Sequence, residues 1–307
     1  MVAPPSPQET LVVLNPRSGR GSHGKTVRAR AEALGYGVEE TASAESAVEL
    51  ARGAVADGHS TIVAAGGDGT VNQVVRGIDR AGGYASVTLG VVPVGTGNNF
   101  ARQLGITDTD TAFAVLRDGE RRRIDLGSAD GNPFVNSCVA GLTADSSGST
   151  SPQLKRQLGV LAYLVTTLRT VSDFESLRLS VQIDGEELDT PVWTGEALSV
   201  RVGNGRRFVP GTTGQANLED GRLDVTVVED VPVLSLMSSA LLERLLGRES
   251  PYITRFLARS LRIRVHDPAA VRFSLDGEII QARTLSCRVR PRTLRVAVGP
   301  GYTADPY

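Results

Sequence analysis

The residues best suited to chemistry are Gly66-Gly67-Asp68-Gly69-Thr70, which lie between the apolar run at 61–65 and a segment with helical spacing from Val71. Glycines let the backbone approach a phosphate closely, and the N–H groups at a helix start favour an anion. A carboxylate in this loop would repel phosphate unless a cation lay between them, so Asp68 indicates Mg²⁺. The same residues would also suit a tight turn with a helix-capping aspartate.

Two further polar loops occupy equivalent places in the pattern. The segment PVGTGNNFAR at 93–102 also lies between an apolar run and a helical stretch, and NPRSG at 15–19 follows the first apolar run. Ligands of open parallel sheets bind at the carboxyl ends of the strands, where these loops would meet. Three coincident loops are difficult to explain as turns alone, so they favour a phosphate-bearing ligand.

The segment GRGSHGKT at 19–26 matches the P-loop pattern GxxxxGK[ST] literally. P-loops begin almost directly after their strand, whereas here four residues, including Pro16, separate the apolar run from Gly19. No strand ending in a lone aspartate supplies the usual magnesium ligand. We interpret the match as chance combined with a glycine-rich turn that could hold an anion.

These loops require a scaffold of alternating strands and helices. Short apolar runs predict strands at 11–15, 36–41, 61–65 and 87–92. Apolar residues at helical spacing predict helices at 25–34, 44–56 and 71–78. Repeated strand–helix units of this length predict a parallel sheet with helices on both faces, which is a doubly wound α/β domain.

After about residue 125 the pattern changes to short alternating runs, which predict antiparallel β structure. The runs lie at 177–183, 197–202, 223–229, 261–265, 271–275 and 294–298. Asp-Gly pairs that could close hairpins lie at 130–131, 184–185, 220–221 and 276–277. Two helical inserts are predicted at 153–170 and 233–246. The expected organisation is a flexible tail at 1–10, an α/β domain at 11–127 and a β-rich domain at 128–289.

Composition narrows the class of protein. A chain of 307 residues with 40% hydrophobic residues can bury the cores of two modest domains. A formal net charge of −1 and 5% aromatic residues give no basic surface with interleaved aromatics for nucleic acid. The sequence contains no run of 18 apolar residues, so no membrane-spanning helix is predicted. The N-terminal segment does not resemble a signal peptide. Cys138 and Cys287 lack CxxC spacing and are expected to be buried thiols in a reducing cytoplasm.

Together, GGDGT, PVGTGNNFAR and NPRSG resemble the bacterial diacylglycerol kinase family, whose relatives include sphingosine kinases. The likeness continues through Lys155, through GNGRRFVPG and QANLEDGRLDV within 203–225, and through SLDGE at 274–278, so it covers nearly the whole chain. It implies an N-terminal doubly wound α/β nucleotide-binding domain and a C-terminal antiparallel β-sandwich. It also implies that residues from about 290 to 307 return to the first domain.

The resemblance further implies the activity and its surroundings. The expected enzyme uses ATP and Mg²⁺ to phosphorylate a hydroxyl of a membrane lipid. It would be cytoplasmic and peripheral at the inner face of the membrane, and relatives of this size often form a homodimer through the β domain. Diacylglycerol, phosphatidylglycerol, a sphingoid base and an isoprenoid alcohol all present a hydroxyl beside an apolar tail, so the lipid stays open.

The resemblance assigns roles to residues by position. The nucleotide contacts would come from Asn15, Thr41, Gly66, Gly67, Asp68, Gly69, Thr70, Asn72 and Thr96. Asp220 would ligate a structural Mg²⁺ together with the backbone carbonyls of Asn217 and Arg222. Asp68 and Glu278 would be catalytic, with Glu278 as the general base, because a neutral alcohol is a poor nucleophile. Phosphoryl transfer otherwise depends on positioning and charge neutralisation. A second Asp-Gly-Glu, at 184–186, is expected to be only a hairpin turn.

Asn99 departs from the family pattern, which usually has aspartate there. An amide keeps the hydrogen bonding but loses the charge that would help to hold water and Mg²⁺ near Asp68. This departure motivates a non-catalytic lipid- or nucleotide-binding protein as one alternative, and GGDGT is shared with NAD kinases as another. The GTGNN loop and the 215–225 run favour the lipid kinase, and Asp68, Asp220 and Glu278 favour catalysis.

The predicted helical inserts have two interpretations. They could pack their apolar stripes on the β domain, which is the usual case, or border a cleft for acyl chains. Arginines at or near these stretches could meet lipid phosphates, although arginine on a helix is more often simply solvated. These arginines are Arg244, Arg248, Arg255 and Arg259.

Overall fold

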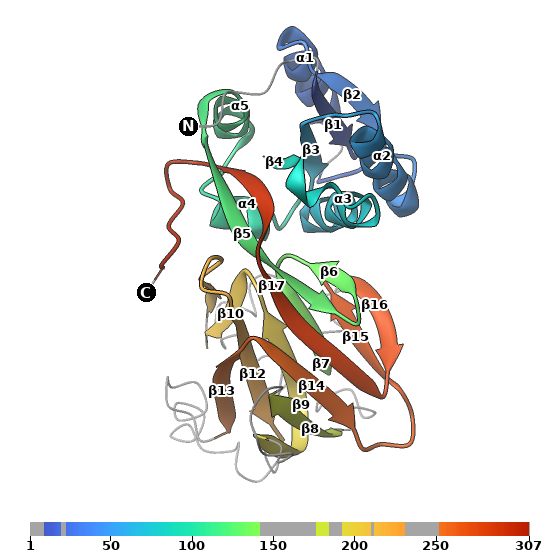
Figure 1. Cartoon of the computed structure of the whole chain (residues 1–307), viewed down its shortest axis with the longest axis vertical. Coiled ribbons are helices and arrows are strands. Elements are labelled where there is room, and N and C mark those ends of the chain that lie inside the picture. The colour runs from blue at the N-terminus through green and yellow to red at the C-terminus, as the bar shows by residue number, and fades with distance from the viewer. Residues whose placement is uncertain are drawn as a thin grey trace. The chain divides into compact units, whose positions relative to one another are not determined.

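The computed structural model of the chain describes residues 9–19, 23–141, 176–183, 192–209, 212–230 and 252–306. Several predictions fall outside the described residues: both helical inserts, most of the N-terminal tail, Lys155, the Asp-Gly-Glu at 184–186, Arg244 and Arg248. The chain divides into two compact units (Figure 1). The first comprises Met1–Leu126, Leu218–Asp220 and Arg290–Tyr307, and the second comprises Gly127–Asn217 and Gly221–Val289.

The first unit is built on a parallel sheet. Its strands, in spatial order, are β2 (Gly37–Glu40), β1 (Thr10–Leu14), β3 (Thr61–Gly66), β4 (Thr88–Pro93) and β17 (Thr284–Val298). The residues of β1, β3 and β4 are all buried, as expected for strands covered on both faces. Strand β1 starts at Thr10, one residue before the predicted start of the α/β domain.

Five helices accompany this sheet in the described part of the first unit. They are α1 (Gly24–Ala33), α2 (Ala44–Ala56), α3 (Asp68–Arg80), α4 (Asn99–Gln103) and α5 (Thr109–Asp118), with a 3₁₀ turn at Gly83–Ala85. The strand order reverses direction after β2, so right-handed crossovers place α1 on one face and α2 and α3 on the other. The predicted doubly wound α/β architecture is confirmed.

Local sequence sets the ends of these helices. Ser43 caps α2 in a capping box with Ser46, and Asp108 caps α5 by accepting a hydrogen bond from the Thr111 N–H at 2.8 Å. The predicted start of α3 at residue 71 is too late. Gly67 is the extended N-cap residue, so Asp68-Gly69-Thr70 already form the first turn of the helix.

The second unit is an antiparallel β structure whose main sheet runs β16-β15-β7-β9-β8-β14-β17, with β12 pairing to both β9 and β13. Its strands are β6 (Asn132–Phe134), β7 (Ser137–Gly141), β8 (Leu177–Ile183), β9 (Trp193–Gly203), β10 (Arg206–Val209), β11 (Thr212–Gln215), β12 (Leu223–Glu229), β13 (Ile253–Ala258), β14 (Ser260–Val265), β15 (Val271–Leu275) and β16 (Glu278–Ala282). Strand β5 (Glu120–Ala129) and β17 each begin in one unit and end in the other. This agrees with the β-sandwich expected for the C-terminal half.

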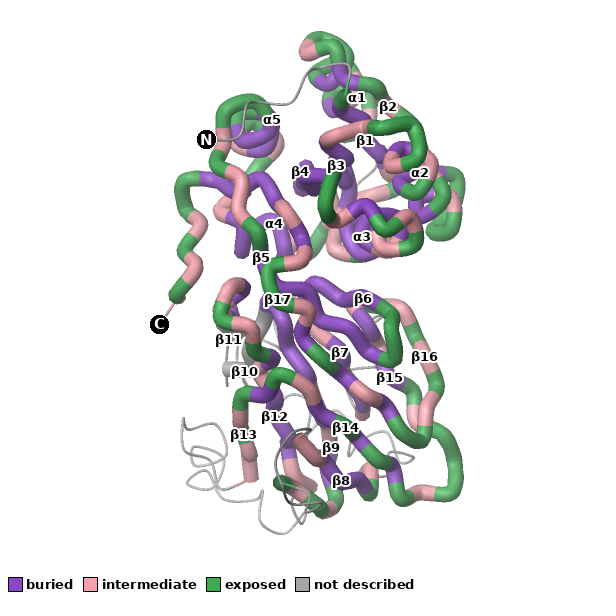
Figure 2. The backbone as a smooth tube through the Cα atoms, viewed as in Figure 1, coloured by how far each residue is buried: buried purple, intermediate pink, exposed green. Residues whose placement is uncertain are grey.

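The second unit has its own apolar core. Side chains from β7, β8, β9, β12, β14, β15 and β17 are buried together, and Figure 2 shows buried residues along these strands. Cys138 and Cys287 are free thiols within this core, as predicted. Among the described helices, none is long and apolar enough to cross a membrane.

The four Asp-Gly pairs do not all behave as predicted. Asp130-Gly131 joins β5 to β6 and Asp276-Gly277 joins β15 to β16, each as a two-residue hairpin turn. The hairpin predicted at Asp220-Gly221 is wrong, because β12 pairs with β9 and β13 and not with the preceding β11. Residues 218–220 are instead part of the first unit, although they lie within the range predicted for the β-rich domain.

Candidate nucleotide and catalytic sites

Three strand-end loops of the first unit meet at one edge of its sheet. Asn15, just after β1, donates from its backbone N–H to the Ala65 carbonyl of β3 at 2.9 Å. Its side-chain amide donates to the Thr70 hydroxyl at 3.1 Å, and its Oδ1 accepts from the Arg17 N–H at 3.0 Å. The structure therefore brings two predicted nucleotide residues, Asn15 and Thr70, into direct contact.

The glycines of these loops differ in whether neighbouring atoms leave room for a side chain. A Cβ added at Gly66 would collide with the Thr70 side chain, and one at Gly95 would collide with the backbone of Gly67. Gly66 must lack a side chain because Thr70 of the first α3 turn folds back over it, and Gly95 must lack one because the β4–α4 loop packs against the β3–α3 loop. A Cβ at Gly69 would meet no atom within 4 Å. Gly69 is exposed in the first turn of α3, so packing does not require a glycine there and a phosphate would have room.

Asp68 connects the two glycine loops. Its Oδ2 accepts hydrogen bonds from the Asn99 backbone N–H at 3.0 Å and from the Asn99 amide at 3.2 Å. Its Oδ1 accepts from the Phe100 N–H at 2.9 Å. Asn98, the N-cap residue of α4, makes no side-chain cap. Asp68 supplies that cap from another loop, so this carboxylate fixes the loop geometry whether or not it also meets a cation.

The other predicted nucleotide residues differ in their access to solvent. Thr96 is exposed in the β4–α4 loop, whereas Thr41 and Asn72 are buried, with 7% and 2% of their surfaces exposed. The Thr41 N–H donates to the Leu14 carbonyl at 2.9 Å and so continues the pairing of β2 with β1. Gly69 and Thr96 can therefore reach a ligand directly, whereas burial limits the access of a ligand to Thr41 and Asn72.

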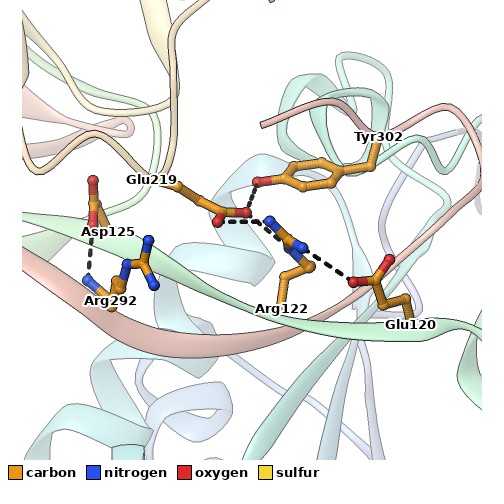
Figure 3. Close-up of polar contacts among 6 residues, drawn as sticks. All are labelled: Glu120, Arg122, Asp125, Glu219, Arg292 and Tyr302. Atoms are coloured by element: carbon orange, nitrogen blue, oxygen red, sulfur yellow. Dashed lines mark hydrogen bonds and ion pairs between the residues drawn. The ribbon is translucent and has the colours of Figure 1, made fainter. Parts of the chain in front are cut away.

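The predicted magnesium loop is anchored through its neighbour Glu219. Arg122 of β5 donates to both carboxylate oxygens of Glu219, from Nε at 3.0 Å and from Nη2 at 2.8 Å. The Tyr302 hydroxyl donates to Glu219 Oε1 at 2.8 Å (Figure 3). The Leu218 carbonyl also accepts from the Asp125 N–H at 2.7 Å. Residues 218–220 are thus held to β5 and to the C-terminal segment.

The charge of Glu219 is stabilised in this setting. Burial raises its pKa, but hydrogen bonds from Arg122 and Tyr302 outweigh burial and leave the pKa below its ordinary value. Burial, and then the Glu219 carboxylate, raise the pKa of Tyr302, which keeps the phenol protonated as a donor. Sequence reasoning did not identify these residues, because Arg122 and Tyr302 lie 97 and 83 positions from Glu219.

The predicted metal ligands lie in one loop between β11 and β12. Asp220 is exposed and belongs to the first unit, whereas Asn217 and Arg222 belong to the second. Among the described residues no group of three or more His, Cys, Asp or Glu side chains could hold a metal. The predicted set needs only one carboxylate and two backbone carbonyls. These are oxygen donors of the kind Mg²⁺ prefers, so their chemistry suits the ion.

Glu278 is the first residue of β16 and is half-buried. It pairs with Leu275 across the Asp276-Gly277 turn. Glu278 belongs to the second unit and Asp68 to the first, so the two predicted catalytic carboxylates come from different units.

Comparison with known proteins decides the family. Residues 9–129 match the diacylglycerol kinase catalytic domain, and residues 136–298 match the YegS C-terminal NAD kinase beta sandwich-like domain. A protein of Pseudomonas aeruginosa named "Probable lipid kinase YegS-like" is 34% identical over 250 residues, covering 81% of this chain and 80% of the relative. The chain belongs to the YegS-like family of lipid kinases.

Further comparisons extend this family likeness along the chain. A relative of the same name from Pseudomonas fluorescens is 32% identical over 302 residues, covering 95% of both chains. The crystal structure of a diacylglycerol kinase from Bacillus anthracis superposes with a TM-score of 0.69 at 20% identity, covering 96% of this chain and 98% of that one. That structure shows a shared fold. The relatives that show the family are named lipid kinases, and lipid kinases are phosphotransferases.

Proposed function

We propose that this chain is an ATP- and Mg²⁺-dependent kinase that transfers the γ-phosphate to a hydroxyl of a diacylglycerol-like membrane lipid, with Glu278 as general base. The observation that carries the proposal is the meeting of the two glycine loops at the start of α3. There Gly66, Gly67 and Gly95 permit close packing, while Gly69 leaves open space. This arrangement suits a phosphate chain, and membership of a lipid kinase family supplies the acceptor class.

The first unit would bind the nucleotide through its main chain. Backbone N–H groups in the first turn of α3 have no partner within the helix and carry the positive end of its dipole. Gly69 and the exposed Thr96 would contact the phosphates, and Asn15 would hold Thr70 and the start of α3 in place through its hydrogen bond. Asp68 would keep the two loops together by capping α4.

Asp220 and the carbonyls of Asn217 and Arg222 would hold the structural Mg²⁺. When bound, the ion would supply positive charge and would order the loop that holds it. Glu219 would keep Asp220 in place, since its ion pair with Arg122 and hydrogen bond from Tyr302 fix the backbone one residue away.

Glu278 would accept the proton of the lipid hydroxyl as that oxygen attacks phosphorus. For this the acceptor hydroxyl must lie within hydrogen-bond reach of the Glu278 carboxylate, at roughly 2.6–3.2 Å. The half-buried position at the start of β16 leaves the side chain accessible to a substrate.

Access to a lipid implies peripheral contact with a membrane at its cytoplasmic face, which we include in the proposal. Arg255, Leu257 and Arg259 are exposed along β13 and its end, and Leu257 keeps 47% of its surface exposed. Alternate residues of a strand lie on one face, so these side chains form a basic and apolar strip suited to anionic headgroups. A homodimer through the second unit remains part of the same proposal.

The test is phosphate transfer from radiolabelled ATP with Mg²⁺ to a panel of lipids in mixed micelles. NAD serves as a parallel acceptor and Glu278→Gln as the control. A labelled lipid that disappears with the Gln variant would support both the activity and the base. Labelled NADP would contradict the acceptor class, and no label with nucleotide binding intact would instead support a lipid- or nucleotide-binding protein.

A further inference from the structure

The turn that precedes Glu278 has an unusual backbone. Asp276 and Gly277 join β15 to β16 and have φ angles of +50° and +101°. Two-residue hairpins of this kind need positive φ at both positions, which glycine adopts freely and aspartate adopts at a modest cost. The conformation of this turn sets the direction in which β16, and therefore Glu278, leaves it.

The side chain of Asp276 ties this turn to a distant segment of the second unit. Its carboxylate accepts hydrogen bonds from three consecutive backbone N–H groups, those of Val135 at 2.6 Å, Asn136 at 3.0 Å and Ser137 at 2.8 Å. The Asp276 N–H donates to the Ser137 carbonyl at 3.0 Å. Hydrogen bonds to a charged acceptor are stronger than neutral ones, so the turn is firmly attached to the start of β7.

The attachment matters because β16 lies at the end of its sheet. In the described part of the chain β16 pairs with β15, and the sheet order begins at β16. An edge strand is restrained on one side only, so its first residue depends on the turn for its position. Leu275, which pairs with Glu278, in turn pairs with Cys138 of β7.

We propose that Asp276 is a positioning residue for Glu278. Its carboxylate holds the turn to the backbone of residues 135–137 and so fixes the place where Glu278 begins β16. This inference rests on the proposed function, in which Glu278 is the general base. A base must stay within hydrogen-bond reach of the proton that it accepts, and a displacement of about 1 Å can cost on the order of 100-fold in rate. Asp276 acts through Glu278 and need not contact the substrate.

Asp130 offers a matched control within the same unit. It also begins an Asp-Gly hairpin, between β5 and β6, with a φ angle of +45°. Its Oδ1 accepts a hydrogen bond from the Ser286 backbone N–H at 3.0 Å. Asp130 therefore has the same residue type, backbone conformation and kind of hydrogen bond as Asp276. The turn that it begins carries no proposed site residue.

The experiment measures kcat, KM for ATP and melting temperature for the full-length Asp276→Asn, Asp130→Asn and Glu278→Gln variants and for the Asp276→Asn/Glu278→Gln double variant. Asparagine keeps the shape of aspartate but has one acceptor oxygen and no charge. We expect Asp276→Asn to lower kcat by about 10- to 100-fold with KM for ATP nearly unchanged. Asp130→Asn should keep kcat within about twofold, even with a similar loss of stability.

The double variant separates positioning from an independent role. If Asp276 acts through Glu278, the double variant should be no slower than Glu278→Gln alone. Equal losses of kcat in Asp276→Asn and Asp130→Asn, or a further loss in the double variant, would overturn the positioning role. A fully active Glu278→Gln would overturn the base assignment and this inference with it, whereas a protein that transfers no phosphate at all would mean that the proposed function itself fails.

Gly277→Ala provides a second route if Asp276→Asn does not fold. A methyl group at Gly277 would meet no atom within 4 Å, so the substitution strains only the backbone at φ +101°. We expect the same loss of kcat with KM for ATP retained. An unchanged kcat in a folded Gly277→Ala protein would contradict the claim that the geometry of this turn matters.

Discussion

Asn99 donates to Asp68 through both its backbone N–H and its side-chain amide, at 3.0 and 3.2 Å, and accepts from Arg102 at 2.9 Å. An aspartate at this position would keep the backbone N–H donor but would replace the side-chain amide donor with a second carboxylate against Asp68. The pair would then need a proton or a cation between the two side chains. The amide of Asn99 therefore joins the two glycine loops without a shared proton or a cation. From the sequence alone, asparagine at this position indicated only a loss of charge.

The substitution Asn99→Asp should make the first unit dependent on a cation. In EDTA at pH 8 we expect a loss of about 1–3 kcal/mol of stability, because a hydrogen bond is replaced by repulsion. The loss should shrink with added Mg²⁺ or at pH 5, where protonation relieves the repulsion. Thermal melts with Mg²⁺ or EDTA measure this, with Asn99→Ala as the control that removes the amide without adding charge. Equal melting of Asn99→Asp and Asn99→Ala in EDTA at pH 8 would refute the role of charge.

The Asp108 carboxylate should make the stability of the first unit depend on pH. Hydrogen bonds from the Thr111 backbone, and then from the Thr107 and Thr111 hydroxyls, lower the pKa of this cap to about 2 from an ordinary value of 3.8. A lowered carboxylate pKa contributes stability that is fully present above the unfolded value of about 4 and lost as the pH falls toward 2. The melting temperature of Asp108→Ala should therefore lie below wild type at pH 7, and the difference should shrink as the pH falls from about 4 toward about 2. A constant difference, or one shared by Asp118→Ala, would argue against this assignment.

At the scale of elements, the loop between β11 and β12 depends on contacts with β5 and with the C-terminal segment. The Arg122–Glu219 pair is bidentate, and the side chain of Glu219 is only 11% exposed. Bidentate pairs of arginine with a shielded carboxylate are stronger than ordinary surface ion pairs. The contacts of Glu219 with Arg122 and Tyr302 order residues 218–220. They therefore position Asp220 within the first unit.

Removing the Tyr302 hydroxyl should loosen this loop. Tyr302→Phe deletes the 2.8 Å hydrogen bond to Glu219, and a hydrogen bond to a charged group contributes about 1.5–3 kcal/mol. We expect a lower melting temperature and weaker Mg²⁺ binding, measured as a higher Mg²⁺ concentration for half-maximal thermal stabilisation. Tyr36→Phe, at a buried tyrosine of the same unit, is the matched control. An unchanged Mg²⁺ requirement in Tyr302→Phe would separate the tyrosine from the metal loop.

At the scale of the whole molecule, a formal net charge of −1 gives no general attraction to an anionic membrane. Contact must then depend on a local surface such as the strip formed by Arg255, Leu257 and Arg259. Each basic residue near an anionic surface contributes about 1 kcal/mol, which salt screens.

Co-sedimentation with phosphatidylglycerol vesicles tests this surface. We expect Arg255→Glu/Arg259→Glu to reduce binding at low salt at least about tenfold, since the change of charge is worth more than 1.4 kcal/mol. Arg262→Glu/Arg264→Glu alters two exposed arginines of β14 by the same charge and serves as the control. Equal losses in both double variants would assign the effect to overall charge, and binding that resists 0.5 M salt would contradict an electrostatic strip.

The sequence by itself determined the order of strands β1 to β4 and of helices α1 to α3, and the positions of two hairpin turns. Apolar runs predicted the strands of the parallel sheet, and glycines marked the loops that follow those strands. Asp-Gly pairs marked two hairpins of the second unit. These features depend on residues within about four positions of each other, through the periods of helices and strands and the need for positive φ.

Only the tertiary structure decided which distant groups meet. It joined Asp68 to α4, drew Leu218–Asp220 into the first unit through Arg122 and Tyr302, and placed the Asp276 carboxylate on backbone groups about 140 positions away. Such contacts have no local pattern, because a carboxylate accepts from whichever N–H groups the folded chain brings to it. Their selection follows from the need to satisfy polar groups that burial removes from water, and that need exists only once the chain is packed.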